Sequence, residues 1–487
     1  MKRHSLLVAA ACFSLTGFML HAASIESNHA GAPPNDPLNA VVRIDAISTV
    51  PNFLLPWQNR TPQSGSGSGV VVEGKQILTN AHNVSDSTMI TVRKQNEDTL
   101  FVAKVKYVDH DCDLALLTVE DPEFFSDITP MKLAETPPPQ SEVVAAGFPI
   151  GGDGLSLTRG IISRIEVRSY THSGQGLLTA QIDASINPGN SGGPVFYGGK
   201  VVGIAFQGST RGESLGYMIP YEIISHFFDD IRDGKVDGFG TNNFSYMLLD
   251  NPDTRAFLKM KAGQTGILVC KVFQEAGSAV KAGDVILSID GKAIANNGNI
   301  RLPDGQPRHF STVISSKQIG ESVKLEVLRD GNVLSMDMPV RKVDEKVEPY
   351  LYDRHPEYFI IGGLVFTRLT ASYLLTFGNS SPPMEIVEKF TETKSSPDEN
   401  VVVLVQILGD EVNVGYQMLD SLVLDKINGQ KVRNLRGVVE MVEQCKDEYI
   451  TFEFEGDVPV TLNIRKLREA TPRILDRYRI PGDRFFE

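Results

Sequence analysis

A serine set among glycines at residues 189–194 (GNSGGP) has the clearest chemical potential in this sequence. A serine hydroxyl is a weak nucleophile at neutral pH, so it needs a base within hydrogen-bond reach and N–H donors aimed at the oxyanion. Gly189 leaves its own N–H unobstructed, and Gly192 and Gly193 let the chain turn sharply. We therefore predict Ser191 as a nucleophile and Gly189, Asn190 and Ser191 as its oxyanion hole, although the hexapeptide alone is also compatible with a surface turn.

Two upstream residues supply the partners that such a serine needs. His82 ends an apolar strand and small turn, LTNAH, and Asp113 opens a second apolar strand, DLALL. The order His, Asp, Ser is that of chymotrypsin-type double barrels. In that chemistry His82 is the general base and then the general acid, and Asp113 holds the histidine tautomer.

The sequence around these residues has the pattern of many short strands. Between residues 41 and 231 apolar runs alternate with Gly, Ser and Asn, at residues 70–72, 76–78, 89–92, 116–119, 143–146 and 201–204. Such spacing predicts a sandwich or barrel. A helical pattern at 221–228 is followed by Asp233 and Gly234, which predicts a domain boundary there.

Two further units follow, and they repeat one plan. Each has an apolar strand, a turn with Gly, a helix and a final pair of strands. The helices are predicted at 310–319 and 435–445, and the matched turns are IDG at 289–291 and ING at 427–429. We interpret them as a repeated α+β unit.

The motifs TNAHNV, DCDLALL and QIDASINPGNSGGPVF, followed by two PDZ-like units, resemble those of the HtrA/Deg serine proteases from about residue 41 to 467. Residues 51–58 and 355–366 resemble the plant-type Deg branch, which also occurs in bacteria. The resemblance implies a mainly β protein, with a chymotrypsin-like double β-barrel protease domain followed by two α+β PDZ-like domains. The expected segments are a signal peptide (1–23), a leader (24–40), the protease domain (41–233), PDZ-like domains at 236–343 and 350–467, and a C-terminal tail (468–487).

The family resemblance also implies a function. Its members degrade unfolded or damaged proteins in quality control, with a chaperone role alongside, and they self-associate as trimers or multiples of trimers. The alternative is a proteolytically silent chaperone or scaffold that uses the PDZ-like domains. All three triad residues and Gly189 are present, which favours an active serine endopeptidase.

The specificity pocket follows from the chymotrypsin-type layout. Its floor is the residue six positions before the serine, and one wall is the strand that follows. The predicted pocket residues are Ser185, Ile186, Ile204, Ala205, Phe206, Gln207 and Gly208. No carboxylate occupies the floor, so we expect cleavage after small to medium apolar residues rather than after Lys or Arg.

The peptide-binding loops of the PDZ-like units are predicted from their glycines, because a bound C-terminal carboxylate needs converging N–H groups. The loop of the first unit is Phe244, Ser245, Tyr246 and Met247, without glycine, and that of the second is Gly362, Gly363, Leu364 and Val365. An insertion at residues 379–399 either covers the second groove or binds a neighbouring subunit. We expect removal of the second unit to change oligomer size more than the chemistry at Ser191.

The apolar loop at residues 52–58 holds Phe53, Leu54, Leu55 and Trp57 between two prolines. Such a loop is either a core lid or a subunit contact, and we favour the contact.

Composition excludes several partners. The net charge of −13 argues against nucleic acid. Zinc-binding and nucleotide-binding motifs are missing, so we expect no metal and no cofactor. His110 and Asp111 are interpreted as a solvated turn rather than as metal ligands. After loss of Cys12 with the signal, the remaining cysteines (Cys112, Cys270 and Cys445) are expected to be free buried thiols.

The N-terminus has the layout of a secretory signal peptide. Lys2 and Arg3 precede an apolar stretch at 6–20, which is too short for a membrane span, and small residues follow at 22–24. An uncleaved anchor or lipid attachment at Cys12 are the alternatives. An Asn83-Val84-Ser85 glycosylation acceptor beside His82 argues against a glycosylating route. We expect a periplasmic protein without a stable membrane span, whose partners are unfolded proteins or peptides.

Overall fold

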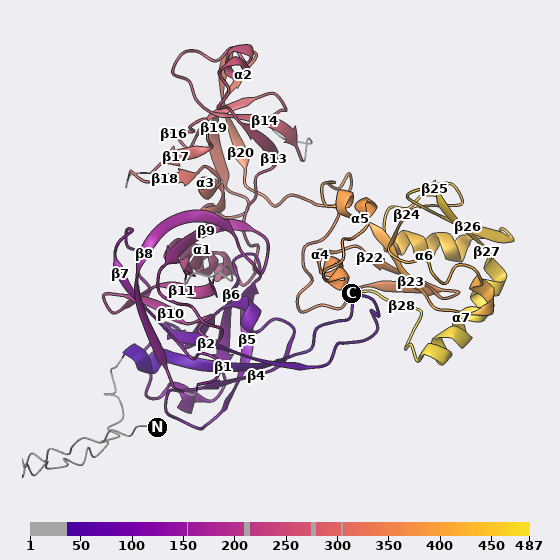
Figure 1. The fold of residues 1–487 in the computed structure, drawn as a ribbon, viewed down its shortest axis with the longest axis horizontal. Helices are drawn as coiled ribbons and strands as arrows, with labels where there is room; N and C mark the ends of the chain where they lie inside the picture. Colours follow the sequence, from indigo (N-terminus) through magenta and orange to yellow (C-terminus); the bar gives the residue numbers. More distant parts are fainter. Residues whose placement is uncertain (1–36, 153, 209–214, 274–278, 303–304) are drawn as a thin grey trace, which may run out of the picture. The chain divides into compact units, whose positions relative to one another are not determined.

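The computed structural model describes residues 37–152, 154–208, 215–273, 279–302 and 305–487. The predicted signal peptide and nearly all of the predicted leader lie outside these residues. Two closed barrels come first along the chain, followed by two α+β units (Figure 1). The mainly β fold class is therefore confirmed.

The first barrel contains six antiparallel strands in the order β1-β2-β3-β6-β5-β4. They are β1 (Val41–Ser48), β2 (Gln63–Val72), β3 (Gln76–Thr79), β4 (Ser87–Arg93), β5 (Phe101–Asp109) and β6 (Leu114–Val119), with short 3-10 helices η1 (Pro37–Ala40), η2 (Ala81–Asn83) and η3 (Pro122–Phe125). Strands β3 and β6 are neighbours, with Thr79 opposite Ala115. This pairing brings together η2, which contains His82, and the turn that contains Asp113.

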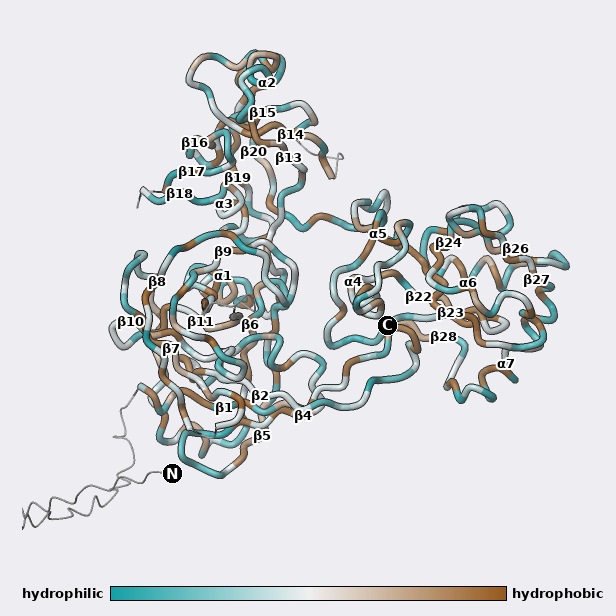
Figure 2. The backbone as a smooth tube through the Cα atoms, in the orientation of Figure 1, coloured by the Kyte–Doolittle hydropathy of each residue, from teal (hydrophilic) through white to brown (hydrophobic). Residues whose placement is uncertain are grey.

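The second barrel has the order β10-β11-β12-β9-β8-β7 and is followed by a helix. Its elements are β7 (Glu142–Gly147), β8 (Ser156–Ser169), β9 (Gly176–Ile182), β10 (Pro194–Tyr197), β11 (Lys200–Gly208), β12 (Gly216–Pro220), α1 (Tyr221–Asp230) and η4 (Ile231–Asp233). One buried cluster joins Ile44 and Leu116 of the first barrel with Phe206 and Phe227 of the second. Figure 2 shows hydrophobic residues recurring along the barrel strands, as burial of alternate side chains requires.

The first α+β unit contains a sheet of order β13-β14-β15-β19-β20. Its elements are β13 (Phe244–Leu248), α2 (Pro252–Phe257), β14 (Ile267–Val272), β15 (Val285–Ile289), β16 (Lys292–Ala293), β17 (Asn299–Arg301), β18 (Pro307–His309), α3 (Ser311–Ser315), β19 (Ser322–Arg329) and β20 (Asn332–Pro339). The turn after β15 has positive φ at Asp290 (45°) and Gly291 (73°). Both angles suit the tight hairpin that the IDG sequence predicts.

The second α+β unit repeats this plan and extends it. Its elements are β21 (Tyr358–Ile361), β22 (Leu364–Arg368), α4 (Ala371–Leu374), η5 (Leu375–Phe377), α5 (Met384–Lys389), β23 (Val402–Ile407), η6 (Glu411–Asn413), β24 (Leu422–Ile427), β25 (Gln430–Lys431), α6 (Leu435–Gln444), β26 (Tyr449–Phe454), β27 (Val458–Asn463), α7 (Ile464–Tyr478) and β28 (Arg484–Phe485). The turn after β24 again has positive φ, at Asn428 (48°) and Gly429 (77°). The predicted repeat is therefore present in the fold.

Residues 468–487 are not a tail, contrary to the sequence-based expectation. Most of them continue α7, which begins at Ile464, and β28 pairs with β21 through Phe485 and Tyr358. The amphipathic pattern of α7 explains its place, because Leu467, Ala470 and Ile474 are all buried against the sheet. The second unit therefore extends to the end of the described chain.

The apolar loop at 52–58 is partly covered within the same chain. Phe53 is only 5% exposed and lies in one hydrophobic cluster with Tyr358 and Ile386 of the second α+β unit. The rings of Trp57 and Tyr358 meet edge to face, 5.9 Å apart. The expectation that the whole loop is a subunit contact is therefore wrong for Phe53 and Trp57, and only Leu54, 41% exposed, is left largely open.

The cysteines differ in exposure. Cys112 is a free buried thiol, as expected, and burial raises the pKa of this thiol well above its ordinary value. Cys270 is exposed and Cys445 is half-buried, so the expectation of burial is wrong for Cys270. In the described part of the chain, no helix has both the length and the apolar character needed to cross a membrane.

Candidate active site

His82 and Asp113 form a close pair at the end of the β3–β6 pairing. His82 Nδ1 lies 2.7 Å from Asp113 Oδ2, and the backbone N–H of His82 donates to Asp113 Oδ1 at 2.9 Å. The side chain of Asn80 donates to the Asp113 carbonyl at 2.9 Å. Asp113 itself has φ of 55°, a conformation that Asp and Asn tolerate better than most residues. These bonds fix both the ring and the carboxylate before any substrate arrives.

The electrostatics of the pair raise the pKa of His82. Burial of the ring lowers the pKa of His82, but the negative charge of Asp113 and its hydrogen bond raise it more, so the net shift is upward from 6.5. A raised pKa suits a group that accepts a proton during the reaction.

Ser191 lies in the loop before β10, tied to the first barrel by two bonds. Its carbonyl accepts from the N–H of Ser68 at 2.8 Å and from Asn83 Nδ2 at 3.0 Å. Asn83 directly follows His82, so one short segment positions both the candidate base and the candidate nucleophile. Neither Ser68 nor Asn83 was predicted from the sequence, because both act through contacts between distant segments.

The Ser191 hydroxyl is in a resting position. Its Oγ donates to the carbonyl of Phe206 at 3.2 Å. Ser191 and His82 line the same cavity, yet no hydrogen bond between Oγ and the His82 ring is present in this arrangement. A rotation of the serine side chain is therefore needed before proton transfer.

Two of the three N–H groups predicted for the oxyanion hole are without a hydrogen-bond partner in the described structure. Among the described residues, the N–H groups of Gly189 and Ser191 make no hydrogen bond, whereas Asn190 N–H donates to Asn187 O at 2.9 Å. Gly189 has φ of 97°, and a Cβ there would lie 2.4 Å from the Phe148 carbonyl. Glycine is therefore required at this position, and Asn190 does not supply a free donor.

A cavity of about 610 Å³ adjoins these groups. Its lining combines the candidate His82 and Ser191 with apolar side chains, and it consists of Ala46, Ser48, Gly65, Ser66, His82, Asn83, Ser85, Ile150, Ile186, Asn187, Pro188, Gly189, Ser191 and Phe206. Of the predicted pocket residues, Ile186 and Phe206 belong to this lining.

Three other predicted pocket residues lie elsewhere. Ser185 is outside the lining and its carbonyl accepts from Thr158. Ile204 and Ala205 are fully buried in two different clusters, on opposite faces of strand β11. Gln207 and Gly208 pair with Tyr217 and Gly216 through the backbone, but their side-chain environment lies outside what the structure describes.

The turn at His110 and Asp111 is not the solvated turn that was expected, because both side chains contact other residues. His110 contacts His172 and Asp353, and the Asp111 carboxylate pairs with Lys342 Nζ at 2.7 Å. Within the described ranges, no group of three His, Cys, Asp or Glu side chains is placed to hold a metal ion.

Comparison with known proteins decides the family. Residues 67–204 match a trypsin-like peptidase domain, and residues 255–340 and 347–485 each match a PDZ domain. The chain is 37% identical over 448 residues to "Protease Do-like 4, mitochondrial" of Arabidopsis thaliana, covering 91% of this chain and 84% of that protein. This chain belongs to the Do-like (HtrA/Deg) serine protease family.

A second relative is similar over most of its length. "Protease Do-like 2, chloroplastic" of Arabidopsis thaliana is 35% identical over 454 residues, covering 92% of this chain and 75% of the relative. A solved structure described as "HtrA-type protease AlgW with decapeptide" aligns with a TM-score of 0.48 and 22% identity, covering 62% of this chain and 95% of that one. The resemblance to the plant-type Deg branch is confirmed, and this Do-like protease is a serine endopeptidase with a double-barrel domain and two PDZ domains.

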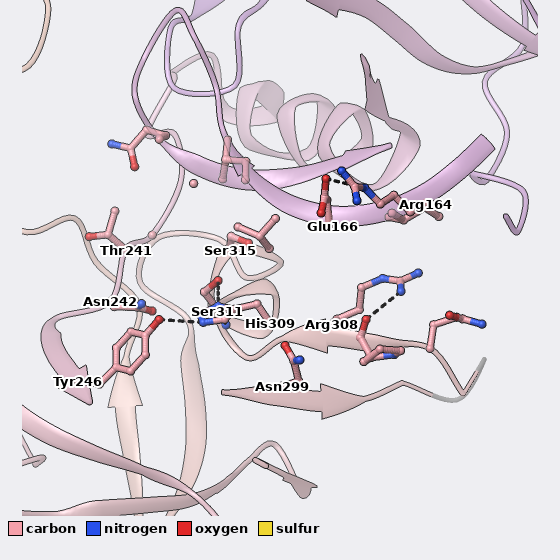
Figure 3. A pocket seen from close by; sticks show the side chains of 18 of the residues that line it. Arg164, Glu166, Thr241, Asn242, Tyr246, Asn299, Arg308, His309, Ser311 and Ser315 are labelled. Carbon is pink, nitrogen blue, oxygen red and sulfur yellow. Dashed lines mark hydrogen bonds and ion pairs between the residues drawn. The ribbon is translucent and has the colours of Figure 1, made fainter. Parts of the chain in front are cut away.

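The first PDZ domain of this Do-like protease has an open edge. Residues 244–248 form strand β13, not the predicted loop, and in the described sheet β13 pairs only with β14. A cavity of about 810 Å³ lies beside Tyr246 and α3 and is bounded on its far side by β8 (Figure 3). Tyr246 Oη and His309 Nε2 are 2.9 Å apart, and His309 Nδ1 is 2.7 Å from Ser311 Oγ. Of the four predicted residues, only Tyr246 lines this cavity, while Phe244 is buried in the core.

The corresponding position in the second PDZ domain is filled by its own chain. Strand β22 pairs with β23 on one side and with β21 on the other. Phe359 and Ile361 of β21 pack in the same cluster as Val438 and Val439 of α6. An added peptide strand therefore has no free edge on β22.

The predicted glycine loop of the second PDZ domain is the turn of this hairpin. Gly362 N–H donates to Thr471 Oγ1 at 2.9 Å, and the carbonyls of Gly362 and Gly363 accept from Asn413 and Leu408. Leu364 and Val365 are fully buried strand residues. Gly362, Gly363, Leu364 and Val365 therefore do not form an open carboxylate-binding loop in this arrangement.

Proposed function

We propose that this protease degrades unfolded or damaged proteins, with Ser191 as nucleophile, His82 as general base and then acid, and Asp113 as the residue that orients His82. The observation that supports these roles most directly is the 2.7 Å contact between His82 Nδ1 and Asp113 Oδ2, at the edge of the cavity that also holds Ser191. This geometry does not favour the alternative of a proteolytically silent scaffold.

The proposed reaction follows from the positions of these groups. Ser191 Oγ turns from the Phe206 carbonyl toward His82 Nε2, gives up its proton there and attacks the substrate carbonyl carbon. The N–H groups of Gly189 and Ser191 bind the oxyanion of the tetrahedral intermediate. His82 then returns the proton to the leaving amine, which leaves an acyl-enzyme that water hydrolyses.

The substrate preference is proposed from the cavity lining. Ile150, Ile186 and Phe206 supply its apolar surface, and no Asp, Glu, Lys or Arg is among the described residues that line it. A substrate Lys or Arg would be buried without a partner, which is costly. We therefore expect cleavage after Val, Ala or Leu.

One experiment tests both parts of this proposal. The full chain is incubated with unfolded β-casein and with a stably folded protein of similar size, and the products are mapped by mass spectrometry. We expect casein to be cut mainly after small and medium apolar residues, because only an unfolded chain can enter the cavity as an extended strand. Cleavage mainly after Lys or Arg would contradict the pocket assignment, and equal cutting of the folded protein would contradict the substrate class.

The assembly is proposed to be a trimer or a multiple of trimers. Part of the apolar surface of the first barrel, including Ile47, Leu54 and Met89, is exposed in the single chain and is available for contacts between copies. Native mass spectrometry with and without casein should show masses at multiples of three chains. A single-chain species with full activity at micromolar concentration would overturn this proposal.

The compartment is proposed from the N-terminal sequence. The basic and apolar residues at 2–20 indicate a leader that directs export, and a periplasmic location is the proposed outcome. The two relatives above are described as mitochondrial and chloroplastic, so organellar import is the competing outcome. Fractionation of the native host, with sequencing of the mature N-terminus, distinguishes the two.

A further inference from the structure

One histidine outside the candidate triad, His172, lies next to the candidate base, and a second, His110, contacts His172. His110 lies in the turn between β5 and β6, and His172 lies in the turn between β8 and β9. Their Nδ1 and Nε2 atoms are 2.9 Å apart, and the ring centroids of His172 and His82 are 6.2 Å apart. His172 thus connects the catalytic region to a second cluster that the proposed reaction does not use.

The segment between the two PDZ domains docks onto this histidine pair. The ring of Tyr352 stacks on that of His172, with centroids 4.1 Å apart and an interplanar angle of 19°, and on that of His110 at 4.5 Å and 25°. Tyr352 Oη also donates to the His172 carbonyl at 2.7 Å. Both rings of the pair are therefore covered by one side chain.

Asp353 fixes the same segment by charge and by backbone bonds. Its Oδ2 lies 3.0 Å from His110 Nε2, so the carboxylate accepts the His110 proton. Its backbone N–H donates to Asp86 Oδ1 at 2.9 Å, and Asp86 N–H donates back to Asp353 Oδ1 at 2.5 Å. Asp86 lies just beyond η2, the helix that contains His82.

The docked segment stands away from the candidate substrate cavity. The lining of that cavity includes His82 and Ser191 but none of His110, His172 and Tyr352. An endopeptidase binds its substrate on both sides of the scissile bond, so a long substrate also extends past His82 where the cavity does not reach. His172 lies beside His82 outside the cavity, and Tyr352 stacks on the other rings of this cluster, His172 and His110.

We propose that Tyr352 and Asp353 form an inhibitory strap, which blocks extended substrates beside His82 while docked on His110 and His172 and must be released before they bind. This inference rests on the proposed function, because it assigns regulation to the same site. In the structure the strap is docked and the Ser191 hydroxyl is turned to the Phe206 carbonyl, an arrangement expected of an enzyme before activation.

The two histidines make the strap sensitive to acid. One nitrogen of the His110–His172 contact must be an acceptor, so a proton on both nitrogens would set two N–H groups against each other. Burial is the largest cause that lowers the pKa of His172, to about 4; His110 and His82 lower it further, while Asp113 and Asp353 oppose them. The other titratable side chains near the His110–His172 contact are those of Tyr352 and Asp86.

The direction of the pH effect follows from linkage. Docking stabilises neutral His172, so its contribution is complete above the ordinary pKa of 6.5 and is lost as pH falls toward about 4. If release returns His172 to solvent, the docking equilibrium should weaken about tenfold at pH 5.5.

The first test compares Tyr352→Ala with the matched control Tyr350→Ala. Among the described residues Tyr350 forms no ring pair with either histidine, and its ring lies 6.1 Å from that of Tyr352. At pH 7.5 we expect Tyr352→Ala to raise kcat/KM for an eight-residue peptide several-fold, with Tyr350→Ala near wild type. Tyr352→Phe keeps the ring stacking and loses one hydrogen bond, so it should raise kcat/KM less than Tyr352→Ala does. It also shows whether the protein stays folded when this position is changed.

Equal or lower activity of a folded Tyr352→Ala enzyme would overturn the strap. Covalent labelling of Ser191 by a small fluorophosphonate separates this result from failure of the proposed function. If the wild type is labelled and cleaves peptide, the proposed catalytic site stands whatever the strap variants do. If neither occurs, the proposed catalytic site itself is wrong.

The second test measures the strap without catalysis. Amide hydrogen exchange of residues 346–356 is followed in full-length Ser191→Ala at pH 7.5 and 5.5, after correction for the intrinsic pH dependence of exchange. We expect protection to fall about tenfold at pH 5.5, and this pH effect to disappear when His172→Gln is added. Unchanged protection at the two pH values, or the same loss in the His172→Gln variant, would overturn the acid release.

Discussion

Replacing Ser191 by alanine should lower kcat by about 10⁶ while leaving the protein folded, since in an acyl-transfer site the nucleophile carries the covalent step. The hydroxyl makes one hydrogen bond, to the Phe206 carbonyl, so its loss costs little stability. Hydrolysis of casein and of a short peptide, together with the thermal midpoint, measures both effects. Residual activity here would come from the oxyanion donors and binding alone.

Ser66→Ala is the matched control for this variant. Ser66 lines the same cavity on strand β2, and it has no role in the proposed proton transfers. We expect it to keep most of the wild-type activity. Wild-type turnover by purified Ser191→Ala would show that another residue is the nucleophile.

Replacing Asp113 by asparagine should lower kcat by about 10⁴, the size of effect that loss of the orienting carboxylate has in such triads. Asparagine tolerates the φ of 55° at this position, so the backbone should keep its conformation. The NH₂ group of asparagine donates hydrogen bonds and cannot accept one from the His82 Nδ1–H. The His82 ring therefore loses the bond that fixes its tautomer.

The pH profile adds a readout that a merely structural role would not change. His82 must be neutral to accept a proton, and its pKa lies above 6.5, so wild-type kcat/KM should fall as pH decreases through that raised pKa. Without the Asp113 charge the pKa of His82 should drop, which moves this falling limb to lower pH.

Asp111→Asn is the control in the same turn. Its carboxylate pairs with Lys342 rather than with His82, so its removal should leave the position of the acid limb unchanged. An Asp113→Asn enzyme with wild-type kcat and an unchanged acid limb would rule out the proposed orienting role.

The catalytic-site candidates were predictable because each lies in a locally distinctive sequence. The candidates are a serine among glycines, a histidine after an apolar strand and an aspartate before an apolar strand. A few neighbouring residues are enough to suggest the role of each. The strand pairing that joins β3 to β6 then places His82 beside Asp113. The repeat was predictable for the same reason, since both turns need residues that accept positive φ.

Residues whose roles come from distant contacts were not predictable in this way. Ser68 and Asn83 bind the Ser191 carbonyl across the two barrels, and neither has a local signature. Ile204 and Ala205 were expected in the pocket, but they are buried in two different clusters, on opposite faces of β11. The packing on both faces of this strand decides this, and no local sequence pattern shows it.

The sequence by itself therefore determined a β sandwich or barrel, a repeated α+β unit and the three residues proposed for catalysis, because periodicity and short motifs specify local structure, while the double barrel and the PDZ domains were implied by the family resemblance. Only the tertiary structure decided that β21 fills the second PDZ groove, that Phe53 is covered within the chain and that Tyr352 stacks on His172. These features are contacts between segments far apart in the chain. Their stability comes from burial and stacking that exist only after folding, so no short stretch of sequence encodes them.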